Sequence, residues 1–220
     1  ALLGFAEILE IDRDNLSEGQ AEAAAIILQN ARYLKTMVDD IIDLSRNSFG
    51  ELRLEIGDID VARVITEVAE TLSPQIEASG QALDIRIDGS TPSIEADGKR
   101  IRQIIFNLLQ NARVHTPGGT TIEVSVCGTG TEVLVEVKDD GEGLPFENPE
   151  DAFGSFRSGL ATGGDPMTGS GIGLTISRQL AELHRGTLEV ESEAGVGTKF
   201  TLLLPVERAA ARKLVLPEAN

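Results

Sequence analysis

The chain has 220 residues, of which 36 are acidic and 19 basic, so its formal net charge at pH 7 is −17. An acidic excess of this size, without a basic cluster, argues against a surface for nucleic acid or for an anionic membrane. One cysteine, Cys127, and two histidines exclude a disulfide framework and a zinc cage, and they favour a reducing compartment. No apolar run approaches the roughly 20 residues that span a bilayer, so we expect a cytoplasmic fragment, whether or not its parent protein is membrane-anchored.

Residues 1–50 have the pattern of two helices separated by a polar break at 14–17. The second helix has an apolar seam that repeats every seven residues at Ile27, Leu34 and Ile41, completed by Ala31, Met37, Val38 and Leu44. One seam on a helical hairpin leaves half of a core open, which predicts a homodimeric four-helix bundle. The alternative is a hairpin packed on its own globular domain. No capping residue precedes Ala1, so we expect the chain to be the C-terminal part of a longer protein.

Residues 51–205 alternate between strand and helix patterns and predict a second domain. Asp60 is expected to cap a helix that runs through Ser79, and further helices are expected at 98–115 and 171–184. The predicted strands are 52–56, 82–88, 93–95, 120–127, 131–138, 187–192 and 197–204. This order predicts an α+β fold in which helices cover one face of a mixed, largely antiparallel sheet. Residues 206–220 form a tail without an assignment.

Two asparagines mark the helix at 98–115. Asn107 and Asn111 lie four residues apart, on a face next to the apolar stripe, where amide side chains need hydrogen-bond partners. Either the two amides form a structural hydrogen-bonded pair, or they bind a ligand. The helix also has a charge of +4, from Lys99, Arg100, Arg102 and Arg113.

The long segment 139–170 begins with Asp-Asp-Gly-Glu-Gly at 139–143 and leads into Gly-Ser-Gly-Ile-Gly-Leu at 169–174. Glycines at this spacing form tight turns or let the backbone approach a ligand closely, and the helix start that follows offers N–H groups to a phosphate. The segment holds seven acidic residues against one arginine, a net charge of −6. Neither a P-loop nor a dinucleotide-binding fingerprint is present.

In this order the motifs resemble those of the sensor histidine kinases. Residues 107–112 look like the N box, 139–143 like G1, 153–157 like a weakened F box, 169–174 like G2, and 195–198 also match. Residues 1–50 resemble the dimerisation and phosphotransfer hairpin of that family. The resemblance implies that residues 51–205 fold as the two-layer α/β sandwich of the GHKL (Bergerat) type, which gyrase and Hsp90 share.

The same resemblance implies a function and a set of site residues. Asp139 would accept a hydrogen bond from the adenine amino group of ATP, Asn111 would hold Mg²⁺, and Asn107 would lie beside the phosphates and the metal. The remaining cofactor contacts implied are Gly141, Gly143, Phe153, Phe156, Arg157, Gly169, Ser170, Gly171, Ile172, Gly173, Leu174 and Thr198. The cationic helix would then face the acidic loop around the triphosphate. A response regulator receiver domain, or another kinase, is the expected partner beside the second copy of the chain.

Three departures from the family pattern keep alternatives open. The acceptor histidine would lie about eight residues before the position that matches Ala1. Val114 stands where the family usually has a lysine or arginine, and Gly154-Ser155 replaces a Glu-Pro pair. The chain is therefore expected to be the catalytic core of a histidine kinase, or a kinase-like scaffold, with tyrosine as one candidate at the acceptor position, that regulates partner proteins. An ATPase of the gyrase and Hsp90 type is disfavoured, because Asn107 occupies the position of their catalytic glutamate.

Overall fold

The computed structural model of the chain describes residues 2–12, 15–17, 19–21, 23–28, 30–31, 34–35, 38, 42, 53–154 and 171–207. Near the N-terminus, α1 (Leu2–Ile11) is followed by helical residues between 19 and 42. Met37, Ile41 and Leu44 of the predicted seam, and the predicted domain boundary at residue 50, lie outside this part of the chain. Within it, no helix is both long and apolar enough to cross a membrane.

The central feature is a five-stranded sheet in the order β2-β4-β5-β7-β6. Its strands are β2 (Ala82–Ile87), β4 (Thr121–Gly128), β5 (Glu132–Asp139), β6 (Thr187–Glu193) and β7 (Gly197–Pro205). Strands β2 and β4 pair in parallel and the other three pairings are antiparallel. The mixed, largely antiparallel sheet expected from the sequence is therefore confirmed.

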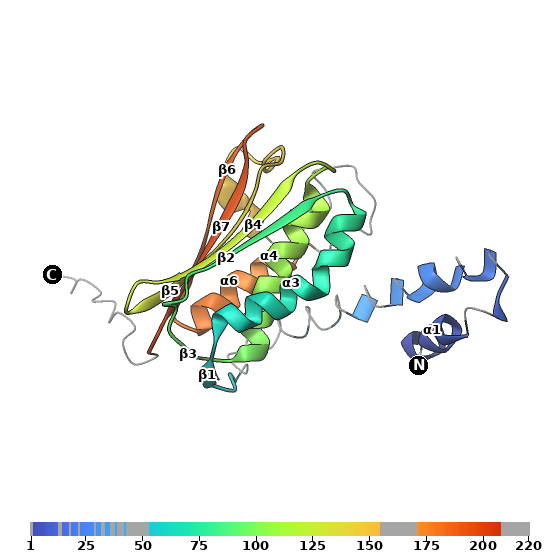
Figure 1. Cartoon of the computed structure of the whole chain (residues 1–220), viewed down its shortest axis with the longest axis horizontal. Helices are drawn as coiled ribbons and strands as arrows, with labels where there is room; N and C mark the ends of the chain where they lie inside the picture. Colours follow the sequence, from blue (N-terminus) through green and yellow to red (C-terminus); the bar gives the residue numbers. More distant parts are fainter. Residues whose placement is uncertain are drawn as a thin grey trace.

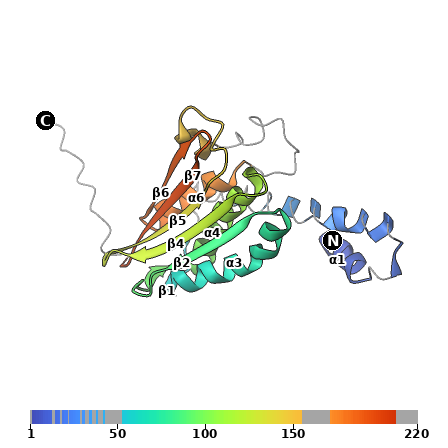
Figure 2. The ribbon, with the colours of Figure 1, turned by 45° about the horizontal axis from the view of Figure 1, so that its top comes forward.

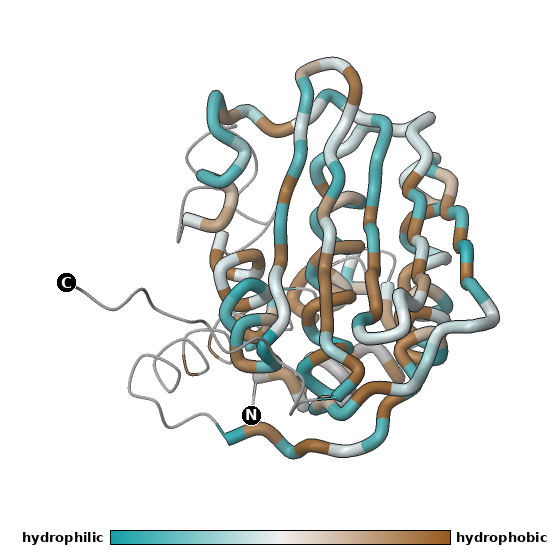
Figure 3. Tube along the Cα trace, turned by 90° about the vertical axis from the view of Figure 1, so that its left-hand side faces the viewer, coloured by the Kyte–Doolittle hydropathy of each residue, from teal (hydrophilic) through white to brown (hydrophobic). Residues whose placement is uncertain are grey.

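Three helices cover one face of this sheet, as the views in Figures 1 and 2 agree. They are α3 (Val61–Ala78), α4 (Gly98–His115) and α6 (Gly173–Leu183). The strands alternate between buried apolar residues and more exposed ones, visible as brown and teal segments in Figure 3. The buried residues of strands and helices form one core, centred on residues such as Ile105, Leu108, Val135 and Leu202.

Helix α4 is held at both of its ends by side chains from other elements. At its start, Asp97 caps the first turn, and the Asp97 N–H donates to His184 Nε2 across 3.0 Å. At its end, the buried Gln81 donates from Nε2 to the carbonyl oxygens of Arg113 (2.9 Å) and Thr116 (2.8 Å). These bonds satisfy carbonyl groups that a helix end leaves open, and they fix the last turn of α4 in place.

One predicted strand is displaced along the sequence. Residues 53–56 have no strand pairing, whereas β1 (Gly57–Ile59) pairs with β3 (Ile94–Ala96) in a small antiparallel sheet. The alternation of leucine and isoleucine with charged residues at 52–56 suggested a strand, but the partner is only three residues long and lies opposite 57–59. Residue 55 is instead held by its backbone, because the Glu55 N–H donates to Asp97 Oδ2 across 2.9 Å.

The loop after β5 contains a short 3₁₀ helix, η2 (Pro149–Phe153), which is not among the elements predicted from the sequence. It is anchored to α6 by three contacts. Arg178 pairs with Glu150 at 2.5 Å and lies 4.6 Å from the centre of the Phe153 ring, while Thr175 Oγ1 donates to the Phe153 carbonyl oxygen across 2.8 Å. This anchoring sets the position of the loop between β5 and η2.

Candidate functional site

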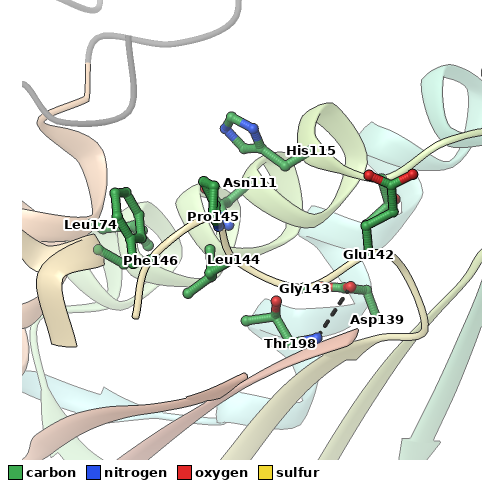
Figure 4. A pocket seen from close by; sticks show the side chains of 12 residues that line it. Asn111, His115, Asp139, Glu142, Gly143, Leu144, Pro145, Phe146, Leu174 and Thr198 are labelled. Atoms are coloured by element: carbon green, nitrogen blue, oxygen red, sulfur yellow. Dashed lines mark hydrogen bonds between the residues drawn. The ribbon is translucent and has the colours of Figure 1, made fainter. Parts of the chain in front are cut away.

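A cavity of about 150 Å³ lies between the last turn of α4, the ends of β5 and β7, and the loop that follows β5 (Figure 4). Its walls come from elements far apart in the sequence. The lining residues are Asn111, His115, Thr116, Asp139, Glu142, Gly143, Leu144, Pro145, Phe146, Ala152, Leu174 and Thr198. Two of these side chains are acidic, and neither lysine nor arginine is among the lining residues in the part of the chain that the structure describes.

Asp139 is the buried carboxylate of the cavity, with only 5% of its surface exposed. Its Oδ1 atom accepts hydrogen bonds from the backbone N–H groups of Gly141 (3.1 Å) and Thr198 (3.3 Å). Burial raises the pKa of Asp139 above its ordinary value, while these two hydrogen bonds act in the opposite direction. Oδ2 accepts no hydrogen bond from any described residue. The site therefore offers one oriented acceptor to a ligand.

Asn111 and His115 belong to the last turn and a half of α4 and line the cavity from that helix (Figure 4). The Asn111 amide makes no hydrogen bond with any residue in the described part of the chain. His115 keeps access to solvent, and partial desolvation lowers the pKa of its ring. An amide without a partner beside a cavity is a poor structural element and a suitable ligand group.

Asn107, one turn earlier on α4, contacts α6 and does not line the cavity. Its Nδ2 atom donates to the Gly173 carbonyl oxygen and to Ser177 Oγ, each across 3.2 Å. Nearby, Ile172 at the N-cap of α6 supplies no side-chain hydrogen bond to the first turn. In the part of the chain that the structure describes, the start of α6 therefore has no side-chain cap from its N-cap residue, and a helix start of this kind can bind an anion.

Three glycines around the cavity lie where another part of the chain comes close to their backbone. A Cβ on Gly141 would lie 2.6 Å from Thr116 Cγ2, and one on Gly143 would lie 2.6 Å from the Glu193 carbonyl oxygen. A Cβ on Gly197 would lie 2.0 Å from the Asp139 carbonyl oxygen. Gly143 and Gly197 also have positive φ values of 78° and 130°. The backbone can fold around Asp139 in this way only with glycine at these positions.

The other site residues named by the family resemblance lie in different places. Gly171, with φ of 64°, and the buried Ile172 precede α6, and Leu174 lines the cavity. Phe153 is absent from the cavity lining; it packs edge-on against Phe200 with ring centres 6.3 Å apart. The remaining four, Phe156, Arg157, Gly169 and Ser170, lie outside the described residues.

The apolar wall of the cavity was not predicted from the sequence. Leu144, Pro145 and Phe146 follow the Asp-Asp-Gly-Glu-Gly motif directly and project into the cavity in Figure 4. A run of three apolar residues inside an otherwise acidic loop was the available signal. Such side chains suit the face of a flat aromatic ligand.

The four cations of α4 lie away from the cavity. Lys99 and Arg100 lie in the first turn, at the opposite end of the helix from Asn111. Arg102 pairs with Glu67 on α3, and Arg113 Nε donates to Gln110 Oε1 across 3.2 Å. None of the four cations lines the cavity, because they lie on faces or turns of α4 that point elsewhere.

The side chains that could act as ligands decide whether a metal ion fits this site. Among the described residues, no group of three or more His, Cys, Asp or Glu side chains could hold an ion. Magnesium usually takes one or two protein oxygens and fills its other positions with water and ligand phosphates. The open Asn111 amide oxygen fits that role, so the residues present suit Mg²⁺ that binds together with a phosphate ligand.

The chain is similar to known proteins over most of its length. Residues 96–208 match the family described as histidine kinase-, DNA gyrase B-, and HSP90-like ATPase. The chain is 32% identical over 204 residues to the sensor protein DivL of Caulobacter vibrioides, covering 93% of this chain and 26% of DivL. It is 34% identical over 185 residues to the adaptive-response sensory kinase SasA of a Synechococcus species, covering 84% and 48%. The chain thus spans about a quarter to a half of these relatives.

Solved structures show the same fold. Full-length ShkA in complex with AMPPNP superposes with a TM-score of 0.73 at 26% identity, over 93% of this chain and 42% of that chain. The histidine kinase AdeS of Acinetobacter baumannii gives a TM-score of 0.69 over 93% of both chains, with 18% identity. The α+β architecture is therefore one that ATP-binding kinases share.

Proposed function

The chain belongs to the histidine kinase-, DNA gyrase B- and HSP90-like ATPases and has the ATP-binding domain of sensor histidine kinases, and we propose that it is the catalytic core of a two-component kinase. It would transfer the γ-phosphoryl group of ATP to an acceptor side chain outside residues 1–220, for delivery to an aspartate of a response regulator. The observation that best supports this role is the buried Asp139 with its open Oδ2 atom, in a cavity shared with Asn111.

Asp139 supplies the basis for selecting adenine. Two backbone N–H groups hold Oδ1, so Oδ2 is the acceptor left for the amino group of the base. Guanine presents a carbonyl oxygen where adenine has that amino group, and two acceptors facing each other in a buried site leave both without a partner. Leu144 and Phe146 supply the apolar surface for the ring.

The phosphates are expected on the side of the cavity formed by Asn111 and the start of α6. Asn111 would hold Mg²⁺ through its amide oxygen, and Asn107 would approach the phosphates with Oδ1, since Nδ2 already binds α6. Bound Mg²⁺ would neutralise charge on the transferring phosphoryl group. Gly169, Ser170, Gly171 and Gly173 would let the backbone fold around the phosphates. Phosphoryl transfer needs positioning and charge neutralisation, so this domain itself requires no nucleophile.

A kinase-like scaffold is the second candidate, and Val114 is the observation that favours it. This residue is three positions after Asn111, on the same side of α4, where the family usually has a cation. The described residues of the cavity supply no lysine or arginine to replace it. Weak neutralisation of the phosphates would favour nucleotide binding without efficient transfer. A chain of this kind would regulate a partner kinase or a response regulator by contact.

Exposed apolar side chains on the N-terminal helices support a homodimer. Ala6, Ala24, Leu28 and Ala31 are buried within the single chain. Large apolar side chains nevertheless face outwards at Phe5, Ile8, Leu9, Ile11, Ile26, Ile27, Leu34, Val38 and Ile42. Leu34 and Val38, from the predicted seam, are each 54% exposed. A second copy of the hairpin would cover this surface in a four-helix bundle.

Radiolabelled ATP distinguishes the two candidates. The parent protein, extended at its N-terminus to include the acceptor position, is incubated with Mg²⁺ and [γ-³²P]ATP. A kinase incorporates label that is stable in base and labile in acid, as expected for phosphohistidine, and passes it to a receiver domain. A scaffold binds the nucleotide but incorporates no label. The Asn111→Ala variant of the same protein is the control for labelling that does not depend on this site.

A further inference from the structure

Ser192 lies outside the cavity lining, yet its hydroxyl contacts two parts of the cavity wall. It belongs to β6 and stands directly opposite Thr198 on β7. Ser192 Oγ accepts a hydrogen bond from the Leu144 N–H across 2.8 Å and lies 3.2 Å from both Thr198 Oγ1 and the Gly197 carbonyl oxygen. Leu144 lines the cavity from the loop after β5, and Thr198 lines it from β7. The Ser192 hydroxyl therefore connects these two parts of the cavity wall.

The backbone around Ser192 is closely packed. The Gly195 N–H donates to the Glu142 carbonyl oxygen across 2.9 Å, so the loop after β5 is fastened to the β6–β7 turn at two points. A Cβ on Gly143 would lie 3.1 Å from Ser192 Oγ, so the glycine at this position leaves room for the serine hydroxyl. From this place Ser192 Oγ is within hydrogen-bond distance of both the Leu144 N–H and Thr198 Oγ1.

The hydroxyl has one proton and two candidate acceptors. Ser192 already accepts from Leu144, so its proton is available to Thr198 Oγ1 or to the Gly197 carbonyl oxygen. When Thr198 Oγ1 receives this proton, the Thr198 hydroxyl is free to donate into the cavity. The backbone N–H of the same threonine donates to Asp139 Oδ1. A donor from Thr198 in the same cavity as the Asp139 Oδ2 acceptor would match a ring nitrogen and the amino group of adenine.

We propose that Ser192 is a positioning residue for nucleotide recognition, which orients the Thr198 hydroxyl and fixes Leu144 at the base-binding end of the cavity. This inference rests on the proposed function, because it assumes that the cavity binds the adenine of ATP. Ser192 itself would not contact the nucleotide. It would act through Thr198 and Leu144, which line the cavity. Because its contacts are at the base end, its effect does not depend on the γ-phosphate.

Calorimetric titration of the whole chain with Mg²⁺-AMPPNP and Mg²⁺-ADP tests the proposal. The variants are Ser192→Ala, which removes the hydroxyl, and Ser192→Thr, which keeps it in a residue suited to a strand. The matched control is Ser125→Ala, which removes a hydroxyl from β4 whose one hydrogen bond to the described residues is to Glu136 Oε2 across 3.4 Å. Thermal unfolding of each variant is measured beside the titrations, to separate loss of binding from loss of fold.

Ser192→Ala should weaken AMPPNP and ADP by the same factor, about tenfold, as expected for two lost hydrogen-bond contacts. Ser192→Thr and Ser125→Ala should stay within about twofold of the wild type, and all midpoints within about 4 °C. If the wild type binds nucleotide and Ser192→Ala binds it with the same affinity, the inference is overturned while the proposed function stands. A loss of affinity in Ser192→Ala that is also present in Ser192→Thr overturns the inference as well. A folded wild-type chain that binds neither nucleotide contradicts the proposed function instead.

Discussion

Replacing Asp139 with asparagine changes one atom of the cavity and tests the assignment of the base site. The side chains have the same shape, so Oδ1 can keep its hydrogen bonds to Gly141 and Thr198. At the open position, an NH₂ donor replaces the Oδ2 acceptor. An adenine amino group would then face a second donor, and both groups would be left without a partner in a site where residue 139 is only 5% exposed.

The expected loss follows from the strength of that one contact. A hydrogen bond to a charged acceptor contributes about 2–3 kcal/mol, which corresponds to a Kd for ATP that is about 30-fold to 150-fold weaker. The stability of the fold should rise, although the affinity for ATP falls. Burial raises the pKa of Asp139, so the ionised form destabilises the folded state above that raised pKa. A neutral asparagine removes this penalty.

The assay combines nucleotide titration with thermal unfolding of Asp139→Asn across pH 4 to 8. We expect weaker ATP binding together with an unchanged or higher unfolding midpoint at pH 7 to 8. The gain in midpoint should shrink as the pH falls through the raised pKa, because wild-type Asp139 then becomes protonated as well. Wild-type affinity for ATP in this variant would refute the reasoning, and so would a large fall in its unfolding midpoint at pH 7.

Three other substitutions test separate parts of the account. Asn111→Ala should abolish the gain in ATP affinity that Mg²⁺ provides, with an unfolding midpoint within about 4 °C of wild type because its amide has no described partner; a retained Mg²⁺ dependence removes the metal assignment. Val114→Lys should raise ATP affinity or, in the longer parent protein, autophosphorylation, and no change in either would show that the missing cation is unimportant. Leu34→Glu should yield folded monomers by light scattering, because this side chain is 54% exposed in the single chain; a persistent dimer would place the interface elsewhere.

The sequence was sufficient to locate α3 and α4 within one residue at each end. Asp60 and Asp97 are capping residues whose side chains accept hydrogen bonds from the first turns. Local signals of this kind depend on neighbouring residues, so they can be read without knowing the fold. The same holds for the β4–β5 hairpin, in which alternating apolar residues flank a glycine turn.

Contacts between distant segments could not be predicted in this way. The displaced strand at 57–59 depends on pairing with residues 94–96, and the burial of Phe153 depends on Phe200 in β7. The η2 helix did have a local signal, since Asn148 caps it and Pro149 occupies its first turn. The interpretation of Asn107 and Asn111 as one pair was incomplete, because α6 binds Asn107 and leaves Asn111 open.

The most direct test of the central claim is a titration of the wild-type chain with AMPPNP, with and without Mg²⁺. The account predicts one nucleotide bound per chain, tighter binding with Mg²⁺, and displacement by ADP but not by GTP at equal concentration. These results follow from one Asp139 acceptor and one open Asn111 amide in each cavity. A folded chain that binds no AMPPNP, or that binds GTP as tightly as ATP, would contradict the account.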